Sequence, residues 1–205
     1  MDNQTGDAPE GAGRRVSSGA KRSVEAESAV LAAARDLLVE KGWAGFSIEA
    51  VARRASAGKP TIYRWWPSKA DLFLAVYIAE KDDVVVVQET GDLVADLVRY
   101  TEGLWSFWRD HPAGAAFRGL VAEAQGGGAA LDILRDKFLP ERLAPVRDLF
   151  ARAAARGALD VGPTDICLEL WIGFNWLRLL TDRLSDPECL PGVIGWVCGG
   201  PGRGR

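Results

Sequence analysis

Residues 58–69 read GKPTIYRWWPSK and combine two adjacent tryptophans with basic and hydroxyl side chains. A short helix is predicted over 59–66, because Pro60 fits the first helical turn and the proline after the tryptophans prevents continuation. On such a helix Ile62 and both tryptophans share one face. We expect that face to pack and the basic and hydroxyl side chains to make external contacts. The alternative interpretation of residues 58–69 is an ordinary surface helix with a basic face and no binding function.

Two helices precede this segment in the predicted pattern. Apolar residues at three- and four-residue steps predict a helix over 24–41, which Gly42 ends. Ser47 can cap a second, short helix over 48–55, and Ser56 stands in the turn that follows. Two short helices around a tight turn are typical of a helix-turn-helix motif.

The remainder of the chain also has helical periodicity. Ser68 and Asp71 form a potential capping box for a fourth helix over 69–81. Four valines at 84–87 are interpreted as the end of this helix or the link that follows it. Further helices are expected over 92–110, 112–125, 129–156 and 164–184, with a short final helix over 188–198. The sequence therefore predicts an all-α fold of about nine helices.

Charge is distributed unevenly along the 205 residues. The net charge is −3, yet residues 11–70 carry 11 Lys and Arg against 5 Asp and Glu, while the chain from residue 71 onward carries 14 against 20. This asymmetry predicts a basic N-terminal binding module joined to an acidic body. Arg14, Arg15, Lys21 and Arg22 could add a DNA-contacting arm, although a solubilising tail is the equal alternative.

Composition excludes several classes of protein. With 48% apolar and 26% charged residues the chain is typical of a globular protein, and it contains no apolar run of membrane-spanning length and no secretory signal. We therefore expect a cytoplasmic protein without membrane association. Three scattered cysteines and the single His111 do not form a metal-ligand or acid/base pattern, so no metal, no cofactor and no enzymatic activity are expected.

The span FSIEAVARRASAGKPTIYRWWPSKADLF, with the helix before it, resembles the DNA-binding domain of the TetR family of bacterial transcriptional regulators. The resemblance covers about residues 24–75, and residues 112–160 are more loosely similar to the ligand-binding half of one branch of the family. It implies a flexible basic arm over 1–22, a three-helix helix-turn-helix domain over 23–68, a larger helical ligand-binding and dimerisation domain over 69–198, and a flexible tail over 199–205.

The resemblance also implies which residues bind DNA. The expected contacts come from Ser47, Lys59, Pro60, Thr61, Tyr63, Arg64 and, at a phosphate, Lys69. The chemistry agrees, since a helix fits the major groove and these side chains offer donors and a methyl group to phosphates and base edges. The family usually has glycine at the turn position of Ser56. Serine is compatible with a tight turn but conformationally less permissive.

A small-molecule effector is expected in the larger domain. The candidate contacts are Trp105, Trp108, Phe117, Trp171, Phe174, Asn175 and Arg178, although the aromatic ones could equally be core. Asn175 and Arg178 stand out in an apolar helix because buried polar groups need partners, but they could face solvent or a second subunit.

The predicted protein is a homodimeric repressor that binds a pseudo-palindromic double-stranded DNA operator and is released by a lipophilic effector. Dimerisation is expected through the helices at 164–184 and 188–198, the second of which its prolines and glycines keep short. The alternative function is a helical ligand-binding or scaffold protein without operator recognition.

Overall fold

The computed structural model describes residues 24–159 and 164–199, and these residues form helices without any β-strand. The predicted arm over 1–22 and all but the first residue of the predicted tail lie outside the described residues. Within the described ranges, no helix is both long and apolar enough to cross a bilayer. The all-α prediction is confirmed.

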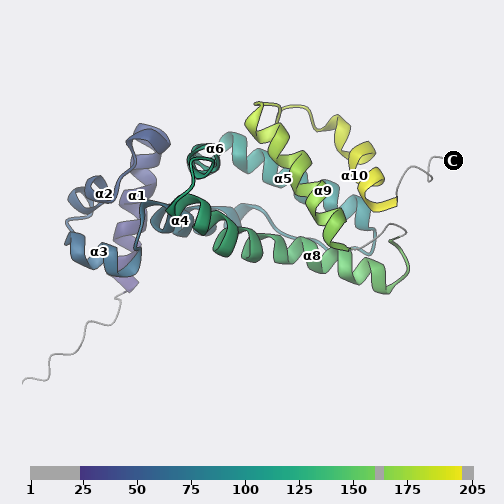
Figure 1. The fold of residues 1–205 in the computed structure, drawn as a ribbon, viewed down its shortest axis with the longest axis horizontal. Helices are drawn as coiled ribbons and strands as arrows, with labels where there is room; N and C mark the ends of the chain where they lie inside the picture. The colour runs from purple at the N-terminus through teal and green to yellow at the C-terminus, as the bar shows by residue number, and fades with distance from the viewer. Residues whose placement is uncertain (1–23, 160–163, 200–205) are drawn as a thin grey trace, which may run out of the picture.

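Three helices form the N-terminal end of the molecule (Figure 1). They are α1 (Val24–Gly45), α2 (Ile48–Arg54) and α3 (Lys59–Trp65). The expected end of α1 at Gly42 is a kink instead: Gly42 has a φ of 60°, where glycine is favoured, and the helix resumes for one more turn. This extra turn carries Trp43 to the junction with the rest of the chain.

Helix α4 (Lys69–Val84) leads from this end into the body of the molecule (Figure 1). The predicted capping box is present, because the Ser68 hydroxyl accepts from the Asp71 amide at 3.1 Å and the Asp71 carboxylate accepts from the Ser68 amide at 3.1 Å. The four valines at 84–87 include both the end of α4 and the start of the link. Val84 is the last residue of α4, and the valines after it belong to a link without regular structure.

The body is built from the remaining helices. These are α5 (Leu93–Asp110), α6 (Pro112–Ala124), α7 (Ala129–Ile133), the π-helix η1 (Leu134–Phe138), α8 (Leu139–Ala155), α9 (Thr164–Leu180), the 3₁₀ turn η2 (Pro187–Cys189) and α10 (Leu190–Gly199). The prediction of a single helix over 129–156 was wrong, because the π-helix η1 separates α7 from α8. Pro145 lies inside α8 without ending it. Helix α9 stops at Leu180 rather than 184, where Asp182 adopts a φ of 58°.

An aromatic core joins α4 to the body. The Tyr77 ring lies 5.1 Å from Phe107 and Phe117 and 5.3 Å from Phe138, measured between centroids. Its hydroxyl accepts a hydrogen bond of 2.8 Å from Trp108 Nε1. The contacts with Phe107 and Phe138 are edge-on and add to the hydrophobic burial of the rings. Tyr77 therefore fixes the position of α4 against α5, α6 and the π-helix.

A sharp corner connects α5 to α6. His111 ends the first helix and precedes the second, where Pro112 occupies the first turn. The two helices approach so closely that a Cβ on Gly114 would collide with the Phe107 carbonyl oxygen and lie 2.7 Å from the Trp108 Cα. Because backbone atoms cannot move aside like a flexible side chain, glycine is required at this crossing.

Gly114→Ala is expected to lower the free energy of unfolding by about 1–3 kcal/mol, since the added methyl group forces α5 and α6 apart. Chemical denaturation at a fixed protein concentration, followed by circular dichroism, measures the change. Gly103→Ala in α5 is the matched control: its Cβ would meet only Val85 Cγ1 at 3.7 Å. This control should be neutral or stabilising, and an equal loss in both variants would contradict the packing argument.

Candidate functional site

The turn between α2 and α3 is built around Ser56. Its φ of 51° lies in the left-handed region that glycine favours, so serine holds this conformation at some cost in strain. The Ala57 amide donates to the Ala52 carbonyl at 3.0 Å and closes the turn. The tight turn expected at Ser56 is therefore formed without glycine.

Ser47 lies at the start of α2 as its N-cap. Its hydroxyl accepts a hydrogen bond of 3.2 Å from the Ala50 amide, which satisfies one of the free N–H groups of the first turn. The side chain is half-buried. A DNA contact by Ser47 stays a prediction, and the hydroxyl already has a structural function.

One face of α3 anchors the helix. Ile62 is fully buried and Trp66, the C-cap residue, is 4% exposed. Trp65 is half-buried, and its ring meets that of Trp66 edge-on at 5.6 Å. The expectation that Ile62 and the two tryptophans pack is confirmed.

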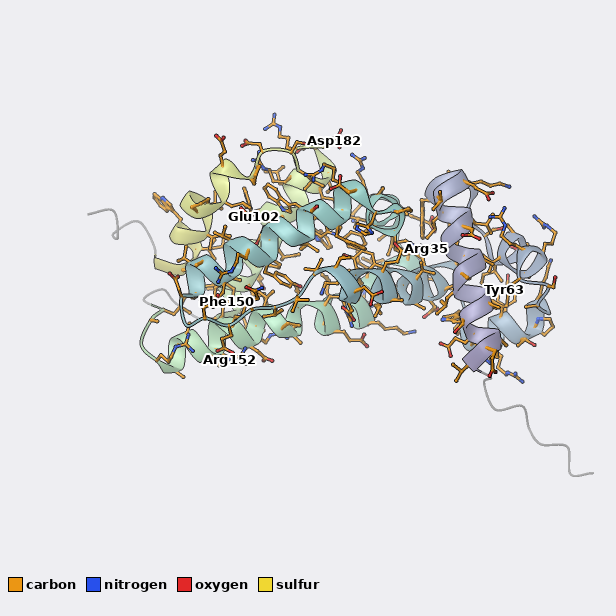
Figure 2. The ribbon with its side chains drawn as sticks, turned by 180° about the vertical axis from the view of Figure 1, so that it is seen from behind. Arg35, Tyr63, Glu102, Phe150, Arg152 and Asp182 are labelled. Carbon is orange, nitrogen blue, oxygen red and sulfur yellow. The ribbon has the colours of Figure 1, made fainter. Side chains whose placement is uncertain are left out.

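The other face of α3 is open to solvent. Lys59, Pro60, Tyr63 and Arg64 are exposed and Thr61 is half-buried. Figure 2 shows Tyr63 at the end of the molecule remote from α9 and α10. The predicted contact residues of α3 thus occupy one accessible surface, which we call the α3 face.

A carboxylate that was not predicted lies beside the α3 face. The Tyr63 hydroxyl donates to Glu49 Oε1 of α2 at 3.1 Å. The pKa of the Glu49 carboxyl is lowered, mainly because the Glu49 backbone amide donates a hydrogen bond to it and secondly because Tyr63 does. The carboxylate is therefore ionised at neutral pH. The sequence could have indicated this carboxylate, because Glu49 lies in the first turn of α2, the helix that precedes α3.

Lys69 has partners in the body of the protein. Its Nζ lies 3.9 Å from the centroid of the Trp43 ring and 3.4 Å from Glu123 Oε2 on α6. The same carboxylate oxygen accepts from Trp43 Nε1 at 2.9 Å. A phosphate contact by Lys69 remains a prediction, and in the free protein its ammonium instead joins α4 to α6.

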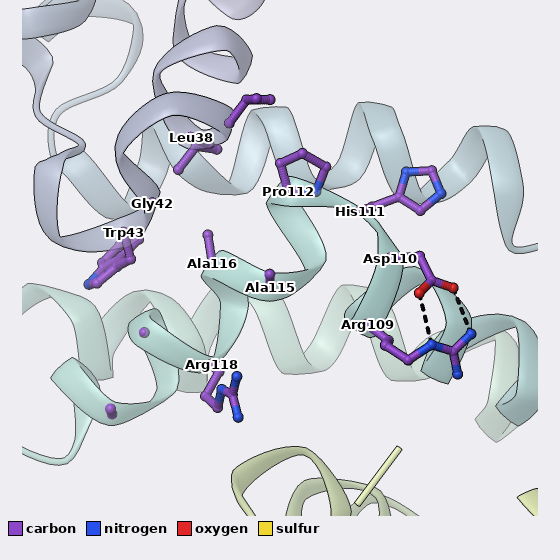
Figure 3. A pocket seen from close by; sticks show the side chains of 13 residues that line it. Leu38, Gly42, Trp43, Arg109, Asp110, His111, Pro112, Ala115, Ala116 and Arg118 are labelled. Carbon is purple, nitrogen blue, oxygen red and sulfur yellow. Dashed lines mark hydrogen bonds and ion pairs between the residues drawn. The ribbon is translucent and has the colours of Figure 1, made fainter. Parts of the chain in front are cut away.

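A groove marks the junction of the N-terminal helices with the body (Figure 3). It has a volume of about 560 Å³ and lies between the C-terminal part of α1, at Leu38 and Trp43, and the start of α6. Alanines and Gly119 of α6 line its base. A Cβ at Gly119 would lie 2.6 Å from the Trp43 Cβ, so a larger residue there would collide with Trp43. On α1, Arg35 forms an ion pair of 3.2 Å with Glu80 of α4 (Figure 2). The two parts of the chain are therefore in direct contact.

The predicted effector residues separate into groups. Trp108 and Trp171 line a small cavity among α4, α5, α8 and α9. Phe117 is fully buried in the aromatic core beside it. Trp105, Phe174, Asn175 and Arg178 form a second cluster, in which Arg178 lies 5.3 Å from the Trp105 ring.

Asn175 is satisfied within the protein. It is fully buried, its Oδ1 accepts from Trp105 Nε1 at 2.6 Å, and its Nδ2 donates to the Trp171 carbonyl at 2.7 Å. Arg178 likewise donates to the Asp186 carbonyl at 3.1 Å. The amide of Asn175 is therefore paired within the protein, whereas Arg178 Nε is buried and has no hydrogen-bond partner among the described residues. An effector contact by either residue stays a prediction.

The cavity has lining residues that the sequence interpretation missed. They include Tyr77, Lys81, Arg142 and Trp176. A signal was present: Lys81 continues the stripe of Phe73 and Tyr77 at four-residue steps, so a charge falls where a helix buries its apolar face. Within the described residues, no group of three metal-ligating side chains occurs.

The fold and the α3 face define a helix-turn-helix DNA-binding protein. Residues 30–76 match the family described as bacterial regulatory proteins, tetR family, and residues 87–190 match the tetracyclin repressor-like C-terminal domain. The chain belongs to the TetR family and is a helix-turn-helix transcriptional regulator.

Relatives agree with this assignment. The HTH-type transcriptional regulator Mb1581 of Mycobacterium bovis is 34% identical over 145 residues, 71% of this chain and 70% of its own length. The DNA-binding transcriptional repressor TetR of Mycobacteroides abscessus is 31% identical over 138 residues, covering 65% and 70%. The crystal structure of the TetR family regulator SCO0332 superimposes with a TM-score of 0.73 at 26% identity, covering 85% and 97% of the two chains.

Lys69→Ala should alter the salt dependence of DNA binding less than Arg64→Ala, because Glu123 already neutralises the Lys69 ammonium. Fluorescence anisotropy with the DNA upstream of the protein's own gene, repeated across salt concentrations, gives the slopes. Glu123→Gln removes the same ion pair and serves as the control. If Lys69→Ala flattened the slope as strongly as Arg64→Ala, Lys69 would have to leave Glu123 for a phosphate.

Proposed function

We propose that the protein is a cytoplasmic repressor that binds a pseudo-palindromic operator as a homodimer and is released by a small-molecule effector. The α3 face inserts into the major groove, with Lys59, Thr61, Tyr63 and Arg64 as its main contacts. The observation that carries this proposal is the division of α3 into a buried anchoring face and a basic accessible one. Pro60 and Ser47 contact the sugar-phosphate backbone of the DNA at the edges of the α3 face.

The partner in the dimer is a second copy, docked through α9 and α10. Support comes from a set of large apolar side chains on these helices that are between 48% and 64% exposed: Ile166, Leu170, Leu177, Leu180 and Trp196. Beside them lies a largely apolar groove of about 560 Å³ that Leu170 and Trp196 line. Apolar patches of this kind on a globular protein are typical of an interface between subunits.

Effector binding lowers DNA affinity through a change in how the two parts of the chain are placed. Helix α4 supplies Tyr77 and Lys81 to the cavity, and it begins at Lys69, only a short link after α3 ends at Trp65. A ligand that prefers one position of α4 shifts the population towards it and alters the spacing of the two α3 faces. The rival function, a helical ligand-binding protein without operator recognition, differs in having no sequence-specific DNA affinity.

Lys59→Ala and Arg64→Ala should each weaken binding to the upstream DNA. Each should also reduce the slope of log Kd against log salt by about 0.9 for every phosphate that the variant no longer neutralises. Anisotropy titrations of labelled duplex measure both quantities. Arg152→Ala in α8 is the control, since this exposed arginine pairs with Glu89 far from the α3 face (Figure 2). Unchanged affinity in both α3 variants would contradict the assignment of the recognition helix.

Leu170→Glu and Leu177→Glu should convert the dimer to a monomer, because each places a charge in an interface that excludes water. Light scattering coupled to size-exclusion chromatography measures the mass. Val86→Glu is the matched control, since Val86 is 66% exposed in the link between α4 and α5, outside α9 and α10. A dimer that persists in both leucine variants, or dissociates in the valine variant, would argue against this interface.

A further inference from the structure

The small cavity among α4, α5, α8 and α9 has charged residues of one sign in its lining. Its charged lining residues are Lys81 of α4 and Arg142 of α8. No carboxyl group occurs among the residues that line it, all of which belong to the described part of the chain. A cavity that presents cations and no acid is suited to an anion.

Two hydrogen-bond donors at the cavity are unused. Arg142 Nε and Trp176 Nε1 are buried and have no hydrogen-bond partner among the described residues. The other indoles of the lining are satisfied, because Trp108 donates to Tyr77 at 2.8 Å and Trp171 to Thr101 at 3.0 Å. An unpaired buried donor is unfavourable, so these two N–H groups call for an acceptor.

The cations are only partly balanced by the protein. Lys81 is 6% exposed, and its Nζ lies 3.5 Å from Asp82 Oδ1. Arg142 Nη1 shares that carboxylate oxygen at 3.2 Å, and Arg142 Nη2 lies 3.9 Å from Glu141. Both acids are more than half exposed and lie at the solvent side, where water screens them.

Burial lowers the pKa of the Lys81 ammonium, against the opposing effect of Asp82. A second negative charge inside the cavity would therefore be favourable. Such an anion would also supply acceptors for the unused donors of Arg142 and Trp176.

Aromatic rings, together with the aliphatic side chains of Leu104, Leu139, Leu143 and Ile172, form the remaining walls. Tyr77, Tyr100, Phe138 and Trp171 line the cavity, and Lys81 Nζ lies 5.4 Å from the centre of the Tyr100 ring. Rings of this kind pack well against a flat apolar body. The lining thus combines a site for an anionic head with walls for a planar group.

The cavity is small in this structure, with a volume of about 30 Å³. A ligand larger than water must therefore widen it. The π-helix η1 and the start of α8 supply Phe138 and Leu139 to the wall, and Pro145 interrupts the hydrogen-bond ladder of α8 further on. A π-turn is an irregular part of a helix that often occurs at functional sites, so the widening is assigned to this wall.

We propose that the effector is an organic carboxylate with an aromatic body, whose carboxylate binds Lys81, Arg142 and the Trp176 N–H. This inference rests on the effector regulation proposed above and names its ligand class. The carboxylate accepts from Arg142 Nε and Trp176 Nε1 and pairs with the Lys81 ammonium. The aromatic body displaces Phe138 and lies among the rings of α4, α5 and α9.

Isothermal titration of the full chain tests the ligand class with pairs that differ only in charge: benzoate against benzamide, and 2-naphthoate against 2-naphthamide. At least one carboxylate should bind about tenfold or more tightly than its amide, because charge-assisted hydrogen bonds are the stronger ones. Equal affinity within both pairs, or no binding of either carboxylate, would overturn the proposal.

The positions are tested by Lys81→Met and Arg142→Met, which should each weaken carboxylate binding about tenfold or more and leave amide binding nearly unchanged. Both variants should fold, because the carboxylate that each cation pairs with, Asp82, is 53% exposed and stays solvated when one cation is removed, and circular dichroism checks this. Lys137→Met is the control, because this lysine of η1 is 58% exposed and pairs with Asp71. Loss of binding in the control alone, or in none of the variants, would place the anion elsewhere.

Operator binding is measured separately, so the two proposals can fail independently. If the chain binds its upstream DNA but no aromatic carboxylate, the ligand class is wrong and the repressor proposal stands. If it binds the carboxylate but no DNA, the repressor proposal fails and the anion site stands. When both hold, the carboxylate should lower the DNA affinity of the wild-type protein and not that of Lys81→Met.

Discussion

Helix α4 has to bury its side chains in two different places at once. Near its start, the Phe73 ring packs edge-on against Trp43 of α1 at 5.0 Å. One turn later, Tyr77 lies 6.0 Å from Phe73 and is enclosed by the rings of Phe107, Phe117 and Phe138. Because protein interiors are close-packed, this row of rings transmits a displacement rather than absorbing it. The placement of the α3 face therefore depends on the packing of the body.

The contacts between α1 and α6 add a second connection with a different chemistry. Glu123 accepts from both Trp43 and Lys69, and Gly119 leaves just enough room for the indole. These contacts are polar and partly exposed, so water can replace them at a modest cost. The aromatic row is therefore the more rigid of the two connections between the N-terminal helices and the body.

Sequence patterns predicted the fold well where local physics decides it. The proline-bounded α3, the Ser68 cap and the apolar face at Ile62 follow from rules that act within a few residues, and the structure confirms them. The cavity was harder to predict, because Lys81 and Arg142 are far apart in the sequence and come to line the same cavity only when α4 and α8 pack together. The partners of Asn175 could not be predicted for the same reason, because Trp105 and the Trp171 carbonyl reach it only through tertiary contacts.

The hydrogen bond between Tyr63 and Glu49 bears on how such a protein would search a chromosome. In the proposed complex, in which Tyr63 contacts DNA, the Glu49 carboxylate would weaken binding to any duplex by repelling its phosphates, and Tyr63 would have to exchange this hydrogen bond for one to DNA. Contacts available only at the operator would offset that loss, which favours the operator over arbitrary sequence. Shorter dwell times on other sites would let the protein sample more of the genome in a given interval.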